Sequence, residues 1–412
     1  MINFIFKNTF ILISISIFLS CSKEEDASPG NIKSTTNSGS NQNTTSPASN
    51  NSSESNGDTG PTNPINEDFK CGNGFYYSSR PEPTNEDNTH RYYEYVWQSD
   101  PAICLNIYEE SLLGNRVNKV GDFFDWAKLN MPNMIPVNVF YIDQENAGDQ
   151  SKLQHDTDFC TLVRNPDDIG ECIAESKDSW GERSHGAGVY ASYLHKGADL
   201  MIYDDAFKHS GGVDEGMYYL NHEYFHTFQT GHMYYFEEKK QFGIRIKDES
   251  DNIPLPFLPI WIGEGGADFA SITMMAKQNL NFDPYKQALS KLDQARAALQ
   301  GSSPSFSLRN FENENIRVND EYYAYGGGTM AHIYLWHLNE NNFKKLIVDY
   351  YSIFAEKYKL NPQSGWKDAF EETFGITLEN FYLEFDAFMR KDRDSQIAII
   401  KSAEEWEKAS WN

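Results

Sequence analysis

The chain has 412 residues, enough for one large or two medium domains, and 14% of them are aromatic, which predicts a substantial core. It carries 35 Lys and Arg residues against 60 Asp and Glu residues, a formal net charge of −25 at pH 7. Such an acidic chain repels nucleic acid and anionic lipid headgroups, so we expect neither to be bound through charge.

The first twenty residues have the pattern of a targeting segment. Lys7 precedes an apolar run over Phe10–Leu19, which is too short to span a bilayer comfortably. The stretch that ends at Cys21 resembles a bacterial lipoprotein signal, which implies a signal peptide over 1–20 and a lipid on Cys21. The acidic stretch that follows resembles the tag that sends lipoproteins to the cell surface in the Bacteroidetes group. These resemblances imply an outer-membrane, surface-exposed protein held by its lipid alone; an ordinary cleaved signal and an N-terminal membrane anchor are the alternatives.

Residues 21–68 are rich in Ser, Asn, Thr, Gly and Pro and have no apolar periodicity. Such a segment cannot bury enough surface to offset the entropy cost of ordering, so we expect a disordered tether. The folded domain is expected over 69–412.

Four cysteines remain besides Cys21, an even number that indicates two disulfides in an exported protein: Cys71, Cys104, Cys160 and Cys172. Three pairings are possible. Proximity in the sequence favours Cys71–Cys104 and Cys160–Cys172.

The first half of the domain, 69–232, mixes element types. Helical spacing predicts a helix over Val120–Leu129, and alternation predicts strands over Met134–Ile142, Val189–Leu194 and Ala198–Tyr203. An amphipathic helix is expected over Val213–Thr230, ending at a glycine.

A long loop is predicted between these strands, over Ala147–Glu182, because the stretch is polar and rich in Gly and Asp. The acidic residues at its beginning fit no calcium-binding loop, so we expect them to be solvated: Asp143, Glu145 and Asp149.

The second half, 233–412, has helical spacing throughout. Helices are predicted over Ile260–Gln278, Pro284–Leu299, Glu321–Leu338, Asn342–Lys357, Gly365–Phe374 and Leu378–Arg390. The expected fold class is therefore α+β, with a small mixed sheet-and-helix half, an all-α half and the Val213–Thr230 helix between them. A cleft between two such halves is a usual place for a functional site.

The sequence His-Glu-x-x-His lies within this central helix. His222 and His226 are four residues apart, so both side chains project from one face and can bind the same tetrahedral zinc. Glu223 lies beside them, where its carboxylate can reach a metal-bound water. A short pattern of this kind also arises by chance, with buried histidines that have only a structural role.

Two carboxylates further along supply what this pattern lacks. A catalytic zinc takes three protein ligands, and Glu264 is the candidate for the third. Asp268 follows four residues later on the same helical face, where it can accept the free N–H of a ligating histidine. The two glycines after Glu264 suggest that another element packs closely against this helix.

His-Glu-x-x-His, the later Trp-x-x-Glu-Gly and the Glu-x-x-x-Asp pair resemble the gluzincin metallopeptidases, a group that includes thermolysin, leukotriene-hydrolase-like aminopeptidases and bacterial collagenases. The resemblance covers roughly residues 198–388, and Gln229 after the second histidine is similar to the collagenase version. It implies a zincin-like fold, Zn²⁺ on His222, His226 and Glu264, and Glu223 as general base and acid. It also implies that Ala198–Tyr203 is the edge strand that receives the substrate backbone. The sequence has no Gly-x-Met-Glu-Asn, the element that binds the substrate amine in the aminopeptidase branch, so we expect an endopeptidase.

A hydrogen-bond donor for the oxyanion is expected near Gly328. The resemblance to the aminopeptidase branch favours Tyr325, and Tyr323 is the second choice; the alternative is that these aromatic residues belong to the core. His232 and His332 are expected to be surface or core residues.

The function expected from these features is zinc-dependent hydrolysis of peptide bonds in extracellular proteins or peptides. Two alternatives stay open. One is a catalytically silent surface-binding lipoprotein on a peptidase fold, and the other is a zinc hydrolase that acts on a non-peptide bond.

Overall fold

The computed structural model describes residues 90–96, 102–131, 133, 136–163, 168–179, 187–191, 198–204, 207, 213–236, 241–242, 258–278, 280–300, 302–303, 305–312, 321–360 and 364–411. The predicted signal peptide, the tether, Cys21 and Cys71 lie outside the described residues. Among the helices described, none is long and apolar enough to cross a lipid bilayer.

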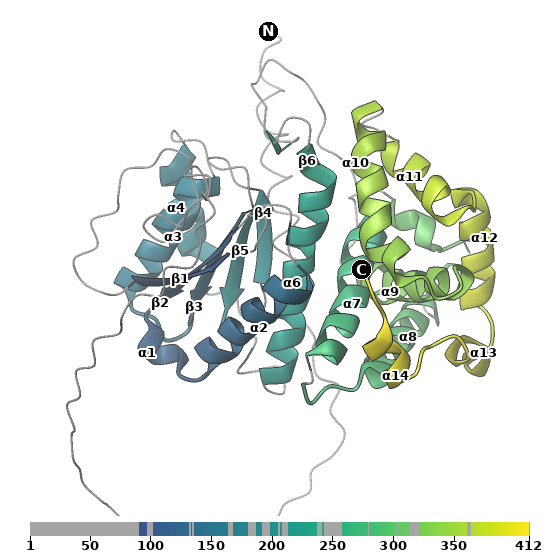
Figure 1. Cartoon of the computed structure of the whole chain (residues 1–412), viewed down its shortest axis with the longest axis horizontal. Helices are drawn as coiled ribbons and strands as arrows, with labels where there is room; N and C mark the ends of the chain where they lie inside the picture. The colour runs from purple at the N-terminus through teal and green to yellow at the C-terminus, as the bar shows by residue number, and fades with distance from the viewer. Residues whose placement is uncertain are drawn as a thin grey trace, which may run out of the picture.

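A five-stranded mixed sheet forms the centre of the first half (Figure 1). In spatial order its strands are β1 (His90–Val96), β2 (Ala102–Tyr108), β3 (Val137–Ile142), β5 (Ala198–Tyr203) and β4 (Ala187–Ala191). The three central strands are parallel, and β1 and β4 run antiparallel to their neighbours at the two edges. A two-stranded sheet of β6 (Tyr235–Phe236) and β7 (Gln241–Phe242) follows the last helix of this half.

Helices cover both faces of the large sheet. They are α1 (Glu110–Leu113), α2 (Arg116–Asn130), α3 (Asp149–Val163), α4 (Ile169–Ser179) and α6 (Val213–Tyr234). Successive strand residues point to opposite faces. In β3, Val139 and Tyr141 pack into the apolar cluster that includes α2 and α6, whereas Phe140 and Ile142 pack with α3.

The second half is helical. Its elements are α7 (Ile260–Lys277), α8 (Pro284–Gln300), η5 (Leu308–Phe311), α9 (Glu321–Leu338), the π-helical turn η7 (Lys345–Asp349), α10 (Tyr350–Leu360), α11 (Gly365–Phe374), α12 (Leu378–Met389), α13 (Arg393–Ile397) and α14 (Ala403–Lys408). From Gly265 to Met275, every residue of α7 is buried, as expected for a helix that is apolar on all sides.

The α6 helix lies between the two halves (Figure 1). It contacts β4 and β5 on one side and α7 and α10 on the other. The α+β class and the central position of this helix are therefore confirmed. The helix is longer than predicted, since it continues past Gly231 to Tyr234.

The predicted long loop over Ala147–Glu182 is wrong, because the chain forms α3 and α4 there. The buried face of α3 mixes polar residues such as Ser151, His155 and Asp158 with Phe159 and Leu162, so its apolar periodicity is weak in the sequence. The Asp158 carboxylate accepts a hydrogen bond of 3.0 Å from the Tyr108 hydroxyl, which compensates its burial.

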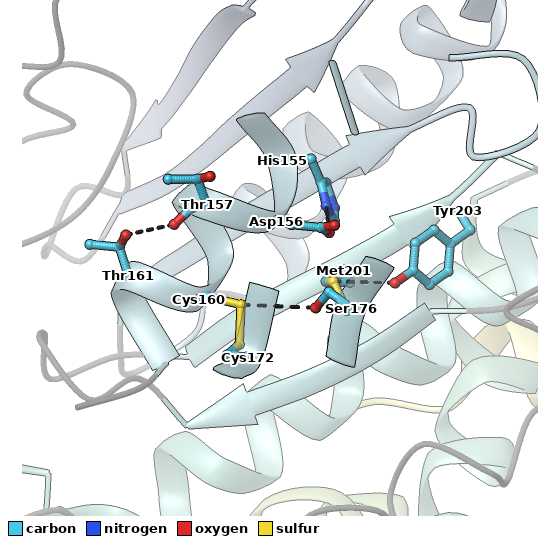
Figure 2. Close-up of a disulfide and its surroundings, with 9 residues drawn as sticks. All are labelled: His155, Asp156, Thr157, Cys160, Thr161, Cys172, Ser176, Met201 and Tyr203. Atoms are coloured by element: carbon cyan, nitrogen blue, oxygen red, sulfur yellow. Dashed lines mark hydrogen bonds and ion pairs between the residues drawn. A yellow bond between two sulfur atoms is a disulfide. The ribbon is translucent and has the colours of Figure 1, made fainter. Parts of the chain in front are cut away.

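The Cys160–Cys172 disulfide joins α3 to α4, as predicted (Figure 2). Cys104 is also disulfide-bonded. Cys160 and Cys172 are both buried against the sheet, in the apolar cluster that contains Phe140 and Met201.

Two further expectations are wrong. The strand Ala198–Tyr203 has the predicted bounds but is not an edge strand, because it pairs with both β3 and β4. The edge beside α6 is β4. Of the three acidic residues expected to be solvated, Glu145 and Asp149 are exposed, but Asp143 is buried and its carboxylate accepts hydrogen bonds from Asn146.

Candidate metal centre

Two neighbouring helices supply the candidate metal ligands. Because His222 and His226 are one turn apart on α6, both imidazoles face α7, which presents Glu264 from its first turns. The Nε2 atoms of the two histidines are 3.1 Å apart. Glu264 Oε2 lies 3.1 Å from the Nε2 of His222 and 3.3 Å from that of His226. These three atoms thus form a nearly equilateral triangle.

The size of this triangle fits a tetrahedral metal ion. Nitrogen and oxygen ligands about 2.0–2.1 Å from zinc are about 3.3–3.4 Å from one another in a tetrahedral arrangement. The observed separations are within about 0.3 Å of that value. His222, His226 and Glu264 form the group among the described residues that could hold a metal ion.

Hydrogen bonds on the far side of each imidazole determine which nitrogen carries the proton. His222 Nδ1 is 3.0 Å from the Asp268 carboxylate, which can only accept, so Nδ1 donates. His226 Nδ1 is 2.7 Å from Gln229 Oε1. The amide of Gln229 is oriented by its other end, since Nε2 donates to the carbonyl oxygen of Gly263. In its neutral form, each imidazole therefore directs an Nε2 lone pair into the triangle.

Three acceptors that converge on one point require a positive charge there. Burial opposes a charge on His222, but its hydrogen bonds to Asp268 and Glu264 prevail and raise its pKa to about 10. Burial opposes a charge on His226 as well, yet Glu264 raises its pKa above the ordinary value. The same histidines outweigh burial at Glu264 and hold its pKa well below the usual range. The donor set thus fits a cation, and two imidazoles with one carboxylate are a ligand set suited to zinc.

The Glu223 carboxylate lies next to this triangle. It is buried, and its charge contributes to raising the pKa of both His222 and His226. The structure therefore brings together all four residues for which the sequence predicted a direct role at the metal.

Close contact between α7 and α9 holds the α7 ligand in place. A methyl group on Gly265 would lie 2.3 Å from the backbone of Gly328, a distance at which the two helices could not pack. A methyl group on Gly266 would lie 2.8 Å from the Tyr351 hydroxyl. The prediction that something packs closely against the glycines after Glu264 is confirmed.

The two tyrosine candidates have different surroundings. The ring of Tyr325 stacks against His222, with centroids 6.1 Å apart. Tyr323 is fully buried instead, and its ring contacts Phe306 and Phe311. The geometry therefore favours Tyr325 as the tyrosine close to the metal ligands.

His332 is a core residue. Its Nδ1 donates to the Gly328 carbonyl oxygen over 2.8 Å, and its ring packs between Trp261 and Phe269. Burial lowers its pKa to about 4, so it is neutral. The side chain of His232 lies outside the described residues.

Four residues around the ligands escaped the sequence analysis or had no assigned role. They are Tyr218 and Lys291 at Asp268, and Gln229 and Tyr351 behind His226. Tyr218 precedes His222 by one helical turn, so its position on the same face of α6 was a usable signal. Lys291 and Tyr351 come from other helices, and no local pattern links them to the site.

No protein family, curated protein or solved structure matches this chain.

Proposed function

We propose that the chain is a zinc-dependent endopeptidase with a zincin-like fold of the gluzincin type. The observation that carries this proposal is the triangle of His222, His226 and Glu264 donors with the Glu223 carboxylate beside it. A divalent metal held by a protein through three donors has room for a water molecule and a substrate oxygen.

The residues of the chain have complementary roles in the proposed hydrolysis. Zinc, when bound, would lower the pKa of its water and polarise the scissile carbonyl. Glu223 would accept the proton of the attacking water and deliver it to the leaving amine nitrogen as the C–N bond breaks. Tyr325 would donate a hydrogen bond to the carbonyl oxygen as negative charge develops on it.

The edge strand β4 is the proposed support for the substrate backbone. It contacts α6, and in the described part of the sheet it pairs on one side only, with β5. An extended peptide could add to its free side through backbone hydrogen bonds. This proposal replaces the role expected for Ala198–Tyr203.

The tether and lipid would place this activity outside the cell. Extracellular proteins or peptides are thus the proposed substrates, and no role is proposed for nucleic acid.

The variant Glu223→Gln tests the proposed reaction. It keeps the shape of the side chain but removes the base, so we expect unchanged zinc content and a 10²–10⁴-fold loss of peptide hydrolysis. The measurements are zinc content, circular dichroism and digestion of a peptide library followed by mass spectrometry. Glu404→Gln is the matched control, because Glu404 is a surface residue of α14 paired with Lys408.

Undiminished peptide hydrolysis by Glu223→Gln would refute the assignment of the base. If the wild-type protein binds zinc but cleaves only ester substrates, it is a hydrolase of a non-peptide bond. Zinc binding without turnover of any substrate would indicate that the chain is a catalytically silent binding protein.

A further inference from the structure

Three donors from two helices converge on one buried carboxylate behind the candidate metal centre, and a threonine hydroxyl from a third helix lies close to it. Asp268 Oδ1 lies 2.8 Å from the Tyr218 hydroxyl and 3.0 Å from His222 Nδ1, both on α6. Asp268 Oδ2 lies 2.7 Å from Lys291 Nζ on α8 and 3.4 Å from the Thr329 hydroxyl on α9. Asp268 itself is on α7 and only 2% exposed.

Lys291 supplies the positive charge in this group. Its side chain is 14% exposed, and its ammonium also lies over the ring of Tyr218, 5.5 Å from the centroid. Lys286 on the same helix has a side chain that is 80% exposed and pairs with Asp283 at the surface. The inward direction of Lys291 therefore distinguishes it from an ordinary surface lysine.

A buried carboxylate needs such a partner. An ionised side chain removed from water is strongly destabilising unless another charge and hydrogen bonds compensate it. With Lys291 on Oδ2, the carboxylate is held so that Oδ1 faces the Nδ1–H of His222. Without Lys291, Asp268 would lose the charge that compensates its burial, and its hold on His222 Nδ1 would weaken.

We propose that Lys291 is a positioning residue for metal binding, which acts on His222 through Asp268. This inference rests on the proposed zinc site, but it concerns the strength of metal binding and not the reaction. Partners of this kind affect metal affinity by about 10–100-fold when they are removed.

The first experiment measures zinc affinity by competition with a chelator. Lys291→Met removes the charge and keeps most of the apolar stem, and we expect zinc binding about 10–100-fold weaker than in the wild type. Lys286→Met on the same helix is the control, with unchanged affinity expected. Lys291→Arg restores the charge and should recover part of the loss. An affinity for Lys291→Met equal to that of the wild type would overturn the proposal.

The second experiment separates action through Asp268 from a general effect on packing. In the Asp268→Asn background the route from Lys291 to His222 is already weakened, so adding Lys291→Met should change zinc affinity by less than about twofold. An equal loss in both backgrounds would show that Lys291 acts by another route.

A spectroscopic measurement supports both experiments. Cobalt(II) in place of zinc reports ligand geometry, so its visible spectrum should change in Lys291→Met and stay unchanged in Lys286→Met. If circular dichroism shows that Lys291→Met does not fold, Lys291→Gln takes its place, since its amide can still donate to Asp268 without charge. Wild-type spectra in every folded variant would refute the proposal.

These outcomes are distinct from those that test the peptidase. A protein that binds zinc as predicted but hydrolyses no peptide contradicts the proposed function and leaves the role of Lys291 intact. Normal peptide hydrolysis by the wild type, together with unchanged zinc affinity in Lys291→Met, contradicts the role of Lys291 and leaves the proposed function intact.

Discussion

The two ligand histidines are held by groups of different charge. His222 donates to the carboxylate of Asp268, whereas His226 donates to the neutral amide of Gln229. Gln229 in turn donates to the hydroxyl of Tyr351 over 2.7 Å. A carboxylate partner makes an imidazole more basic than an amide partner does, so His222 is expected to be the stronger of the two nitrogen ligands.

Gln229→Leu tests the role of the amide. The change leaves the Nδ1–H of His226 without its acceptor, so we expect zinc binding about tenfold weaker, measured by chelator competition. Tyr351→Phe removes only the hydroxyl at the far end of this chain of hydrogen bonds, and a smaller loss is expected. A larger effect of Tyr351→Phe than of Gln229→Leu would contradict this order.

The protonation of His222 predicts two opposite effects of pH. The thermal stability of the metal-free protein should fall as the pH rises, whereas the stabilisation by zinc should increase. Its pKa is raised from 6.5 to about 10 in the folded, metal-free protein. The resulting stabilisation is complete below about pH 6.5 and is lost as the pH rises toward 10, so the melting temperature of the chelator-treated protein should fall across this range. Zinc requires the unprotonated imidazole, so the stabilisation that added zinc gives should grow with pH.

The check is thermal unfolding of both forms from pH 6.5 to 9. His222→Gln should flatten the dependence in the metal-free form. A metal-free melting temperature that does not fall with pH would contradict the raised pKa.

Among the residues of the site, those linked by one turn of helix were predictable. His222 with His226, and Glu264 with Asp268, are each four residues apart, and such a spacing is visible in the sequence. Lys291 was not predictable, because its approach to Asp268 depends on how α8 packs against α7.

At the level of elements, the crossing of α7 and α9 determines where Glu264 lies. Gly265→Ala would place a methyl group 2.3 Å from Gly328 and force the helices apart. We expect a loss of about 1–3 kcal/mol in the free energy of unfolding, measured in denaturant, with weaker zinc binding because Glu264 moves with α7.

Gly263→Ala is the matched control on the same helix. A methyl group there meets its nearest neighbour, Leu258 Cδ2, at 3.7 Å, which is ordinary contact. Its expected effect is neutral or stabilising by up to about 1 kcal/mol, because alanine favours helix more than glycine does. Equal losses for Gly263→Ala and Gly265→Ala would refute the importance of the crossing.

Elements with an apolar stripe or alternation were predicted well, and others were not. The bounds of Ala198–Tyr203, Glu321–Leu338 and Gly365–Phe374 agree with the sequence prediction. The strand β2 was missed, although Ile103, Leu105 and Ile107 alternate with other residues in it. The helix α3 offered only a weak signal, since polar residues interrupt the apolar positions of its buried face.

For the whole molecule, the sequence predicted the α+β composition and the central helix, but not the order of the strands. Pairing depends on contacts between distant segments, and the edge position of β4 follows from hydrogen bonds that β5 makes on both sides. The same composition is compatible with several strand orders, so the edge of the sheet was assigned to the wrong strand.

The proposed attachment of the whole chain to a membrane is tested at Cys21. We expect the full-length protein from a lipoprotein-exporting bacterium to start at Cys21, to carry acyl chains there and to sediment with membranes. Cys21→Ser should abolish acylation at this position and weaken sedimentation with membranes, because it removes the thiol that carries the lipid. Mass spectrometry of the N-terminal peptide is the measurement, and an unmodified Cys21 in the wild type would contradict the proposal.

The contact between Gly265 and Gly328 also limits how this protein can evolve. Neither position can gain a side chain unless the helices separate, and separation displaces the carboxylate of Glu264. In descendants that keep the metal, the two positions should therefore stay small or change together, as contacting positions do. Such a coupled pair, combined with the short histidine pattern, would identify distant relatives that the pattern alone cannot distinguish from chance.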